Sequence, residues 1–203
     1  MITFKKTIGI SSVMVFLLTV FLYPTPEKEN NATALLLIDI QDFYFSGGRS
    51  PLENPEKASL NAKKLLEKFR EKGMLVVHIR HNAKSGAEIH KHVMPIKKEK
   101  VISKDHVNGF KDTDLLKYLR TNKVKQLVIC GMMTHMCVEA ATRAAYDFGF
   151  DCILIGDACA TRDLKYGDKI IKAVDAHLST LSSLDGYYAK VMNTEDYLGS
   201  LAQ

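Results

Sequence analysis

The amino-acid sequence predicts an α/β fold with three layers, α/β/α, in which helices cover both faces of a mostly parallel, Rossmann-like central sheet of about six strands. Two observations lead to this prediction. Apolar runs without polar alternation, such as "ALLLIDI" at 34–40 and "MLVVHI" at 74–79, are typical of parallel strands buried on both faces. These runs alternate with segments of helical periodicity, which indicates βαβ units.

Local signals predict the elements in order along the chain. A helix should follow the loop "GGRSPLENPE", because Asn54 can cap it, Pro55 suits its first turn and Gly73 suits its end. The stretch 80–100 has no clear period and contains three histidines, so we expect a long functional loop there. Further strands are expected at 100–103, 125–130, 152–157 and 188–192, and further helices at 113–122, 135–148, 166–183 and from 194 onward.

The N-terminus differs from the rest of the chain. Residues 1–26 contain Lys5 and Lys6 near their start, followed by an uncharged apolar run at 7–23, which predicts a signal peptide or signal anchor. An uncleaved anchor is slightly favoured because no small-x-small cleavage site follows Tyr23 directly; a buried hydrophobic helix is the alternative. Because the lysines stay inside, the domain should be extracytoplasmic, whether periplasmic, secreted or membrane-anchored. Residues 27–33 are expected to be a linker and 34–203 a single domain.

Charge and composition exclude some classes of protein. The chain of 203 residues has a net charge of +5, and its lysines are scattered, which does not favour nucleic-acid binding. Among the four cysteines, Cys130 and Cys152 fall within apolar runs and are interpreted as buried packing thiols. No glycine-rich phosphate-binding pattern follows the first predicted strand, so a nucleotide cofactor has no support.

Chemically capable residues gather where the predicted strands end. In open α/β sheets, ligands bind beyond the carboxyl ends of the strands. Asp39 near the end of the first strand could be a general base or only a structural ion-pair partner. Cys137 opens a helix whose dipole should favour the thiolate, and a nearby lysine would strengthen this; a packing thiol is the alternative. With Lys104 they form one cluster; the other residues at strand ends are His78, Arg80, Asp157 and Cys159.

Four segments carry a resemblance to a known family. "LLLIDIQDF", "EKVISKDHVNGF", "VICGMMTHMCVEAATRAAYDFGF" and "DACATRD" resemble the isochorismatase-like cysteine hydrolase superfamily over residues 34–192. The resemblance implies that Asp39, Lys104 and Cys137 are a catalytic triad that hydrolyses a C–N bond of a small amide, ureide or carbamoyl compound through a thioester. It also implies a cis peptide bond at Met132–Met133, with the N–H groups of Met133 and Cys137 as an oxyanion hole.

The resemblance leaves several roles open. Substrate-binding roles are expected for Gln41, Phe43, Phe110 and His135, although each could instead belong to the core. Thr134 can cap the helix that carries Cys137. No metal or cofactor is expected, because the Asp-x-His pattern of the metal-binding nicotinamidases is missing after the second strand. A metal site made of His81, His90 and His92 is the less favoured alternative.

Two other functions compete with amide hydrolysis. A vinyl-ether hydrolase of the isochorismatase type would not need the thiol, so Cys137 argues against it. A catalytically silent small-molecule-binding domain would not need the triad. The expected partners are a small-molecule substrate and further copies of the chain in a homodimer or homotetramer, with membrane contact only through the possible N-terminal anchor.

Overall fold

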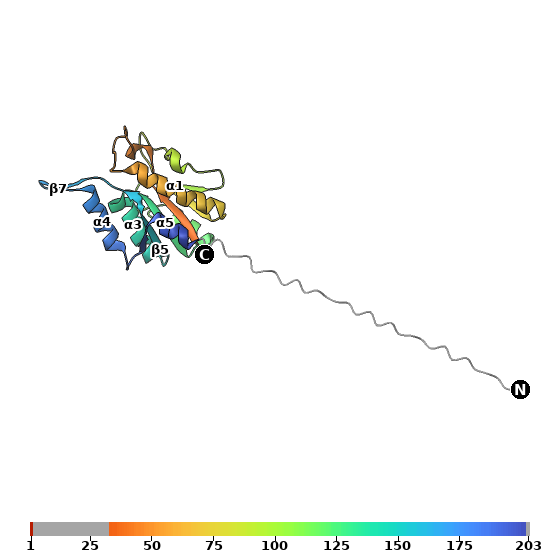
Figure 1. Cartoon of the computed structure of the whole chain (residues 1–203). Helices are drawn as coiled ribbons and strands as arrows, with labels where there is room; N and C mark the ends of the chain where they lie inside the picture. Colours follow the sequence, from red (N-terminus) through yellow and green to blue (C-terminus); the bar gives the residue numbers. More distant parts are fainter. Residues whose placement is uncertain (2–32, 202–203) are drawn as a thin grey trace.

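The computed structural model describes Met1 and residues 33–201 (Figure 1). Residues 2–26 of the predicted signal segment, residues 27–32 of the predicted linker and the last two residues of the predicted domain lie outside the described residues. Within the described part of the chain, no helix combines the length and apolarity that crossing a membrane requires.

A six-stranded, wholly parallel sheet forms the centre of the domain, which confirms the predicted fold class. Its strand order is β3-β2-β1-β4-β5-β8. The inner strands are buried on both faces, so their sequences are continuous apolar runs. The strands are β1 (Thr33–Ile38), β2 (Leu75–His81), β3 (Lys100–Lys104), β4 (Gln126–Met132), β5 (Asp151–Ala160) and β8 (Lys190–Met192).

Helices cover both faces of this sheet. α1 packs against β5 and α5, whereas α3 packs against β5 and α4, so the two pairs lie on opposite faces (Figure 1). Right-handed crossovers require this split, because the chain moves one way across the sheet from β1 to β3 and the other way from β3 to β8. The helices are α1 (Pro55–Glu71), α2 (Leu115–Thr121), α3 (Glu139–Asp147), α4 (Ala173–Leu184) and α5 (Thr194–Ser200), with short turns η1 (Asp42–Tyr44), η2 (Lys91–Val93) and η3 (Thr134–Val138).

A buried charged cluster ties α1 to the sheet. Both carboxylate oxygens of Glu99 accept hydrogen bonds from Arg70, at 2.7 and 2.8 Å. One of these oxygens also lies 2.9 Å from Nε2 of His78. Burial alone would raise the pKa of Glu99, but Arg70, the N–H of Ile96 and His78 together lower it to about 2. His78 therefore has a structural partner, away from the carboxyl ends of the strands.

The structure differs from the predictions at the starts of α4 and α1. The segment predicted as the first part of a helix at 166–183 forms an antiparallel hairpin, β6 (Leu164–Tyr166) and β7 (Lys169–Ile171), which projects from the domain (Figure 1). Gly167, with a φ of 59°, supplies the left-handed conformation that a two-residue hairpin turn needs. At α1, Pro55 occupies the first turn as predicted, but Asn54 is left-handed and its side chain does not cap the helix.

Candidate active site

The carboxyl edge of the sheet brings Asp39, Lys104 and Cys137 together. Asp39 directly follows β1, Lys104 is the last residue of β3, and Cys137 lies in the turn η3 after β4. Nζ of Lys104 lies 2.7 Å from Oδ2 of Asp39 and 3.3 Å from Sγ of Cys137. Asp39 and Lys104 have side-chain exposures of 0%, and Cys137 is 6% exposed. An ammonium group thus joins a carboxylate to a thiol in a nearly dry environment.

Asp39 is held in an unusual conformation. Its φ of 49° is left-handed, which is uncommon for residues other than glycine and tends to occur at functional sites. Apart from Lys104 and the adjacent thiol of Cys137, neither carboxylate oxygen has a hydrogen-bond partner within residues 33–201. A buried carboxylate with so few partners, placed next to a thiol, is suited to accept the proton of that thiol.

The electrostatics of Cys137 act against the effect expected from the helix dipole, which would favour the thiolate. Burial, followed by the proximity of Asp39, raises the pKa of Cys137 to about 12, although Lys104 opposes the shift. Burial also raises the pKa of Asp39, against the lowering effect of Lys104. The helix dipole is therefore outweighed by desolvation. In the free protein the thiol keeps its proton, and a base must remove that proton for the sulfur to attack.

The backbone around Gly131 sets the position of Cys137. Gly131 has a φ of 132°, and a Cβ there would lie 2.0 Å from the carbonyl oxygen of Ile38, so only glycine fits between β4 and β1. The peptide bond between Met132 and Met133, shortly after Gly131, is cis as predicted. The helix then starts with η3, a π-helical turn, instead of the expected α-helical turn; such turns are frequent at functional sites. Thr134 does not cap it.

Gln41 proves to be a structural residue. It is fully buried, and its amide nitrogen donates to the carbonyl oxygens of His81 (3.0 Å) and Ala87 (2.7 Å). Its amide oxygen accepts from the backbone N–H of His81 at 2.8 Å. Both amide hydrogens are therefore used by the chain that leaves β2. Its amide hydrogens are therefore not free to bind the substrate, for which Gln41 was a candidate.

The other three expected substrate-binding residues lie in different places. Phe110 packs in the core against Phe148 and Phe150, with ring centroids 5.2 and 6.4 Å away, at the far end of α3 from Cys137, which argues against a substrate role. Phe43 lines a cavity of about 540 Å³ formed with loop residues 46–49 and 85–86. Nδ1 of the half-buried His135 is hydrogen-bonded to the hydroxyl of Thr161.

His90 and His92 of the segment 80–100 lie edge to face, with ring centroids 4.5 Å apart, and each also contacts another residue. The ring of His90 stacks on Phe45 with centroids 3.6 Å apart, and Nδ1 of His92 lies 2.8 Å from the hydroxyl of Ser59. Over residues 33–201, no three His, Cys, Asp or Glu side chains are grouped so that they could hold a metal ion. All four cysteines are buried and unpaired, as expected for Cys130 and Cys152.

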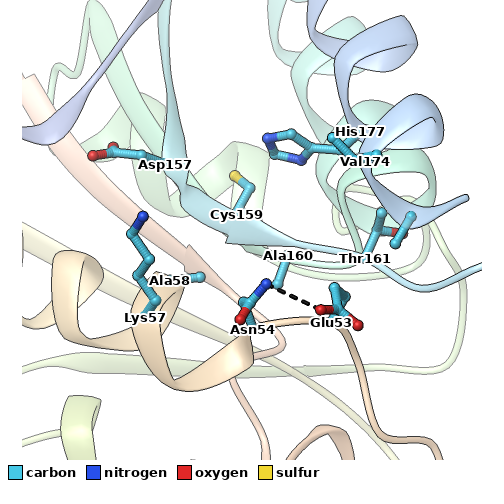
Figure 2. A pocket seen from close by; sticks show the side chains of 11 residues that line it. Glu53, Asn54, Lys57, Ala58, Asp157, Cys159, Ala160, Thr161, Val174 and His177 are labelled. Atoms are coloured by element: carbon cyan, nitrogen blue, oxygen red, sulfur yellow. Dashed lines mark hydrogen bonds between the residues drawn. The ribbon is translucent and has the colours of Figure 1, made fainter.

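A second cavity lies beside the triad. It has a volume of about 320 Å³ and is lined by the first turns of α1 and α4 and by the end of β5, including Cys159 and His177 (Figure 2). Nδ1 of His177 lies 2.9 Å from the hydroxyl of Thr134 in η3, so the cavity borders the turn that carries Cys137. Asp39, Lys104 and Cys137 line neither cavity. Asp157 at its rim accepts two hydrogen bonds from Thr194 and so anchors α5.

Two residues lie next to the triad without having been predicted to do so. His81 was considered from the sequence only as a possible metal ligand, and its Nδ1 lies 3.3 Å from Nζ of Lys104. Tyr44 is buried near the triad: burial raises the pKa of its phenol, and the charges of Asp39 and Cys137 raise it further. Neither residue belongs to a recognisable motif, and their positions depend on strand register and on the path of η1.

Known proteins resemble this chain over almost the whole described domain. The family model for the isochorismatase domain matches residues 33–196. The uncharacterised isochorismatase family protein YddQ of Bacillus subtilis (strain 168) is 45% identical over 177 residues, which are 82% of this chain and 98% of that protein. The crystal structure of an isochorismatase-type hydrolase from Oleispira antarctica superposes with a TM-score of 0.81 at 42% identity, covering 83% and 97% of the two chains.

Two further relatives have names that state a reaction. Streptothricin hydrolase of Streptomyces noursei is 34% identical over 158 residues, which are 72% of this chain and 56% of that enzyme. Maleamate amidohydrolase of Pseudomonas putida is 27% identical over 194 residues, which are 83% and 86% of the two chains.

Proposed function

Because this chain belongs to the isochorismatase family and is a hydrolase, we propose that it cleaves a C–N bond of a small amide, ureide or carbamoyl compound through a thioester on Cys137. One observation carries the proposal: a buried lysine ammonium lies between a carboxylate and a cysteine thiol, at 2.7 and 3.3 Å. A vinyl-ether hydrolase would not need the thiol, and a silent binding domain would not need the triad.

The first chemical step follows from the protonation states. Asp39 accepts the proton of the thiol as Sγ of Cys137 attacks the carbonyl carbon, so charge separation occurs only as the new bond forms. A carboxylate whose pKa is raised by burial is a better match for this proton than an exposed one. Lys104 stabilises the anion on either side of the transfer.

The second half reverses the proton transfer. Asp39 gives its proton to the departing nitrogen, the C–N bond breaks, and an acyl thioester remains on Cys137. Water then attacks the thioester with Asp39 as base, and the thiol regains its proton. We propose the backbone N–H groups of Met133 and Cys137 as the donors that stabilise the oxyanion in both halves.

The name of one relative, maleamate amidohydrolase, supports an amide-type substrate. The other relative is named as a hydrolase of streptothricin, and neither name fixes the substrate here. The test is ammonia or amine release by the full-length chain across primary amides, ureides, carbamoyl compounds, maleamate and streptothricin, with isochorismate as the vinyl-ether probe. Turnover of isochorismate alone, or of nothing in the panel, would contradict the proposal.

A pair of cysteine variants separates chemistry from packing. Cys137→Ala should abolish release from any amide that the wild type hydrolyses. Cys152→Ala is the matched control, because Cys152 is a buried core residue, 7% exposed, whose thiol is hydrogen-bonded to the backbone carbonyls of Thr142 and Phe150. The control should lose some stability and keep its turnover.

We also propose that the chain assembles with further copies of itself. Exposed apolar side chains gather on the projecting hairpin and on the adjacent face of α4, where Tyr166 is 83%, Val174 60% and Leu178 58% exposed. Patches of this kind on a soluble domain tend to mark interfaces. Light scattering should give a dimer or tetramer, and Tyr166→Lys with Val174→Lys should dissociate it; a monomeric wild type would contradict the proposal.

An extracytoplasmic location is proposed on the sequence of residues 1–26 alone. Cell fractionation of the full chain should place the domain outside the cytoplasm, and recovery in the cytosolic fraction would contradict this.

A further inference from the structure

We propose that His81 is a positioning residue of this site: its neutral imidazole, protonated on Nε2, accepts a hydrogen bond at Nδ1 from Lys104 and holds the ammonium between Asp39 and Cys137. The proposal rests on the function proposed above for that triad. It adds a residue whose role no sequence motif indicated.

Strand register places the two side chains next to each other. His81 in β2 and Lys104 in β3 are paired across the parallel ladder, so both side chains project to the same face at the same level. Nδ1 of His81 lies 3.3 Å from Nζ of Lys104. Gln41 fixes the backbone of His81 through its N–H and its carbonyl group, at 2.8 and 3.0 Å. A buried residue thus anchors the imidazole at the end of its strand.

The ammonium of Lys104 has more acceptors than hydrogens. Its three N–H bonds face the carboxylate of Asp39 (2.7 Å), the carbonyl oxygen of His106 (3.1 Å), Nδ1 of His81 and Sγ of Cys137 (both 3.3 Å). During the proposed reaction a proton moves from the sulfur to Asp39, so these two acceptors change, whereas the carbonyl oxygen of His106 and Nδ1 of His81 stay the same. The hydrogen bond to the imidazole therefore determines how far the N–H bonds of Lys104 are directed toward the sulfur.

The charged surroundings require a neutral imidazole. His81 faces Lys104 from β3, Asp39 from the end of β1, Asp105 from the end of β3, and Arg49 from the loop after η1. Burial and then Lys104 lower its pKa, whereas the two aspartates oppose the shift. A proton on Nδ1 would remove the acceptor and place a second cation against the ammonium. Activity should therefore fall as the pH drops through the pKa of His81, below 6.5.

Nitrogen-15 NMR of the histidine side chains in the full-length chain tests the contact without any substrate. We expect His81 to be protonated on Nε2 at neutral pH, with Nδ1 as an acceptor, and Lys104→Met to raise the pKa of His81. A proton on Nδ1 in the wild type would overturn the proposal even if Lys104→Met failed to fold. So would a pKa of His81 that does not respond in a folded Lys104→Met protein.

Two substitutions of His81 test the role. Asn places a carbonyl oxygen close to the position of Nδ1 but does not titrate, whereas Leu has no acceptor. His81→Leu should lower kcat about 10- to 100-fold, because the ammonium is misplaced. His81→Asn should keep most of the turnover and lose the acid inflection attributed to His81. His92→Asn is the control, since that ring contacts Ser59 and should leave the pH profile unchanged.

The outcomes separate this proposal from the proposed function. Equal kcat and equal pH profiles in the wild type and His81→Leu would overturn the role of His81, whatever the substrate. If the wild type hydrolyses no amide, the proposed function fails, and the pH dependence of Cys137 alkylation by iodoacetamide replaces turnover as the readout. In that case His81→Leu must still change the pH profile of Cys137 alkylation, and His81→Asn must give the wild-type rates at alkaline pH.

Discussion

Replacing Lys104 with methionine tests the energetic state of the buried pair. Methionine keeps the unbranched side chain and removes the charge. In the wild type, the ammonium and carboxylate are 2.7 Å apart with no exposure, so their attraction is about 6 kcal/mol at an effective dielectric constant of 20. That attraction is offset by desolvation of both ions, whereas removing one partner leaves a buried, uncompensated carboxylate. We expect Lys104→Met to lower the unfolding free energy by about 3–5 kcal/mol.

The loss of stability in Lys104→Met should depend on pH and on a second substitution, at position 39. Without Lys104 the pKa of Asp39 rises further, so the stability deficit should be largest above that pKa and shrink at acidic pH, where the carboxyl binds a proton. Asn suits the left-handed backbone at position 39, and Asp39→Asn removes the orphaned charge. The double variant should therefore lose much less stability than the sum of the two single losses.

Urea unfolding at pH 5 and pH 8 measures all four proteins of this cycle. A deficit of 3–5 kcal/mol corresponds to a drop in Tm of about 6–20 °C for a domain of this size. The reasoning is refuted if Lys104→Met is within about 1 kcal/mol of the wild type at pH 8, where the deficit should be largest. It is equally refuted if the double variant loses the full sum.

Three further predictions follow. Gly131→Ala should lower the unfolding free energy by about 4 kcal/mol or more, measured by thermal unfolding, because its Cβ would lie 2.0 Å from a carbonyl oxygen of β1. Gly149→Ala, at a position with positive φ but open space, should lower it by only about 1 kcal/mol. Equal losses would contradict the steric argument. Since the pKa of Glu99 is lowered to about 2, its pairing with Arg70 stabilises the fold fully above pH 4.5. When the unfolding free energy is measured at decreasing pH, this contribution should disappear toward pH 2 in the wild type. Glu99→Gln should not show this loss. With a pKa of about 12, Cys137 in the free protein should react with iodoacetamide roughly 10³-fold more slowly at pH 7 than an ordinary thiol, as peptide mapping would report; a faster reaction would restore the thiolate that the structure argues against.

The sheet could be predicted from the sequence because its signals are local. Apolar runs, helical periodicity and glycine punctuation lie within a few residues of each other, and each predicted strand is present. The segment 166–171 shows the limit of such reasoning. Its composition allowed a helix, but Gly167 permits a tight hairpin turn, and the choice depends on a conformation that periodicity does not report.

Only those site residues that lie at strand ends could be predicted from the sequence. Asp39, Lys104 and Cys137 each come at a strand end, so a parallel topology brings them together. His81 required the register between β2 and β3, and the role of Gln41 required knowing where the chain turns after β2. The protonation state of Cys137 depends on burial at the assembled edge, which outweighs the helix dipole that the sequence indicated.

The account depends most on Cys137 as the nucleophile. The most direct measurement is turnover of the best amide of the panel by Cys137→Ala, together with mass spectrometry of acid-quenched wild type during turnover. We expect a loss of at least about 10³-fold in kcat for the variant and an acyl adduct on the peptide that contains Cys137. Undiminished turnover by Cys137→Ala, with no adduct on the wild-type peptide, would contradict the thioester mechanism.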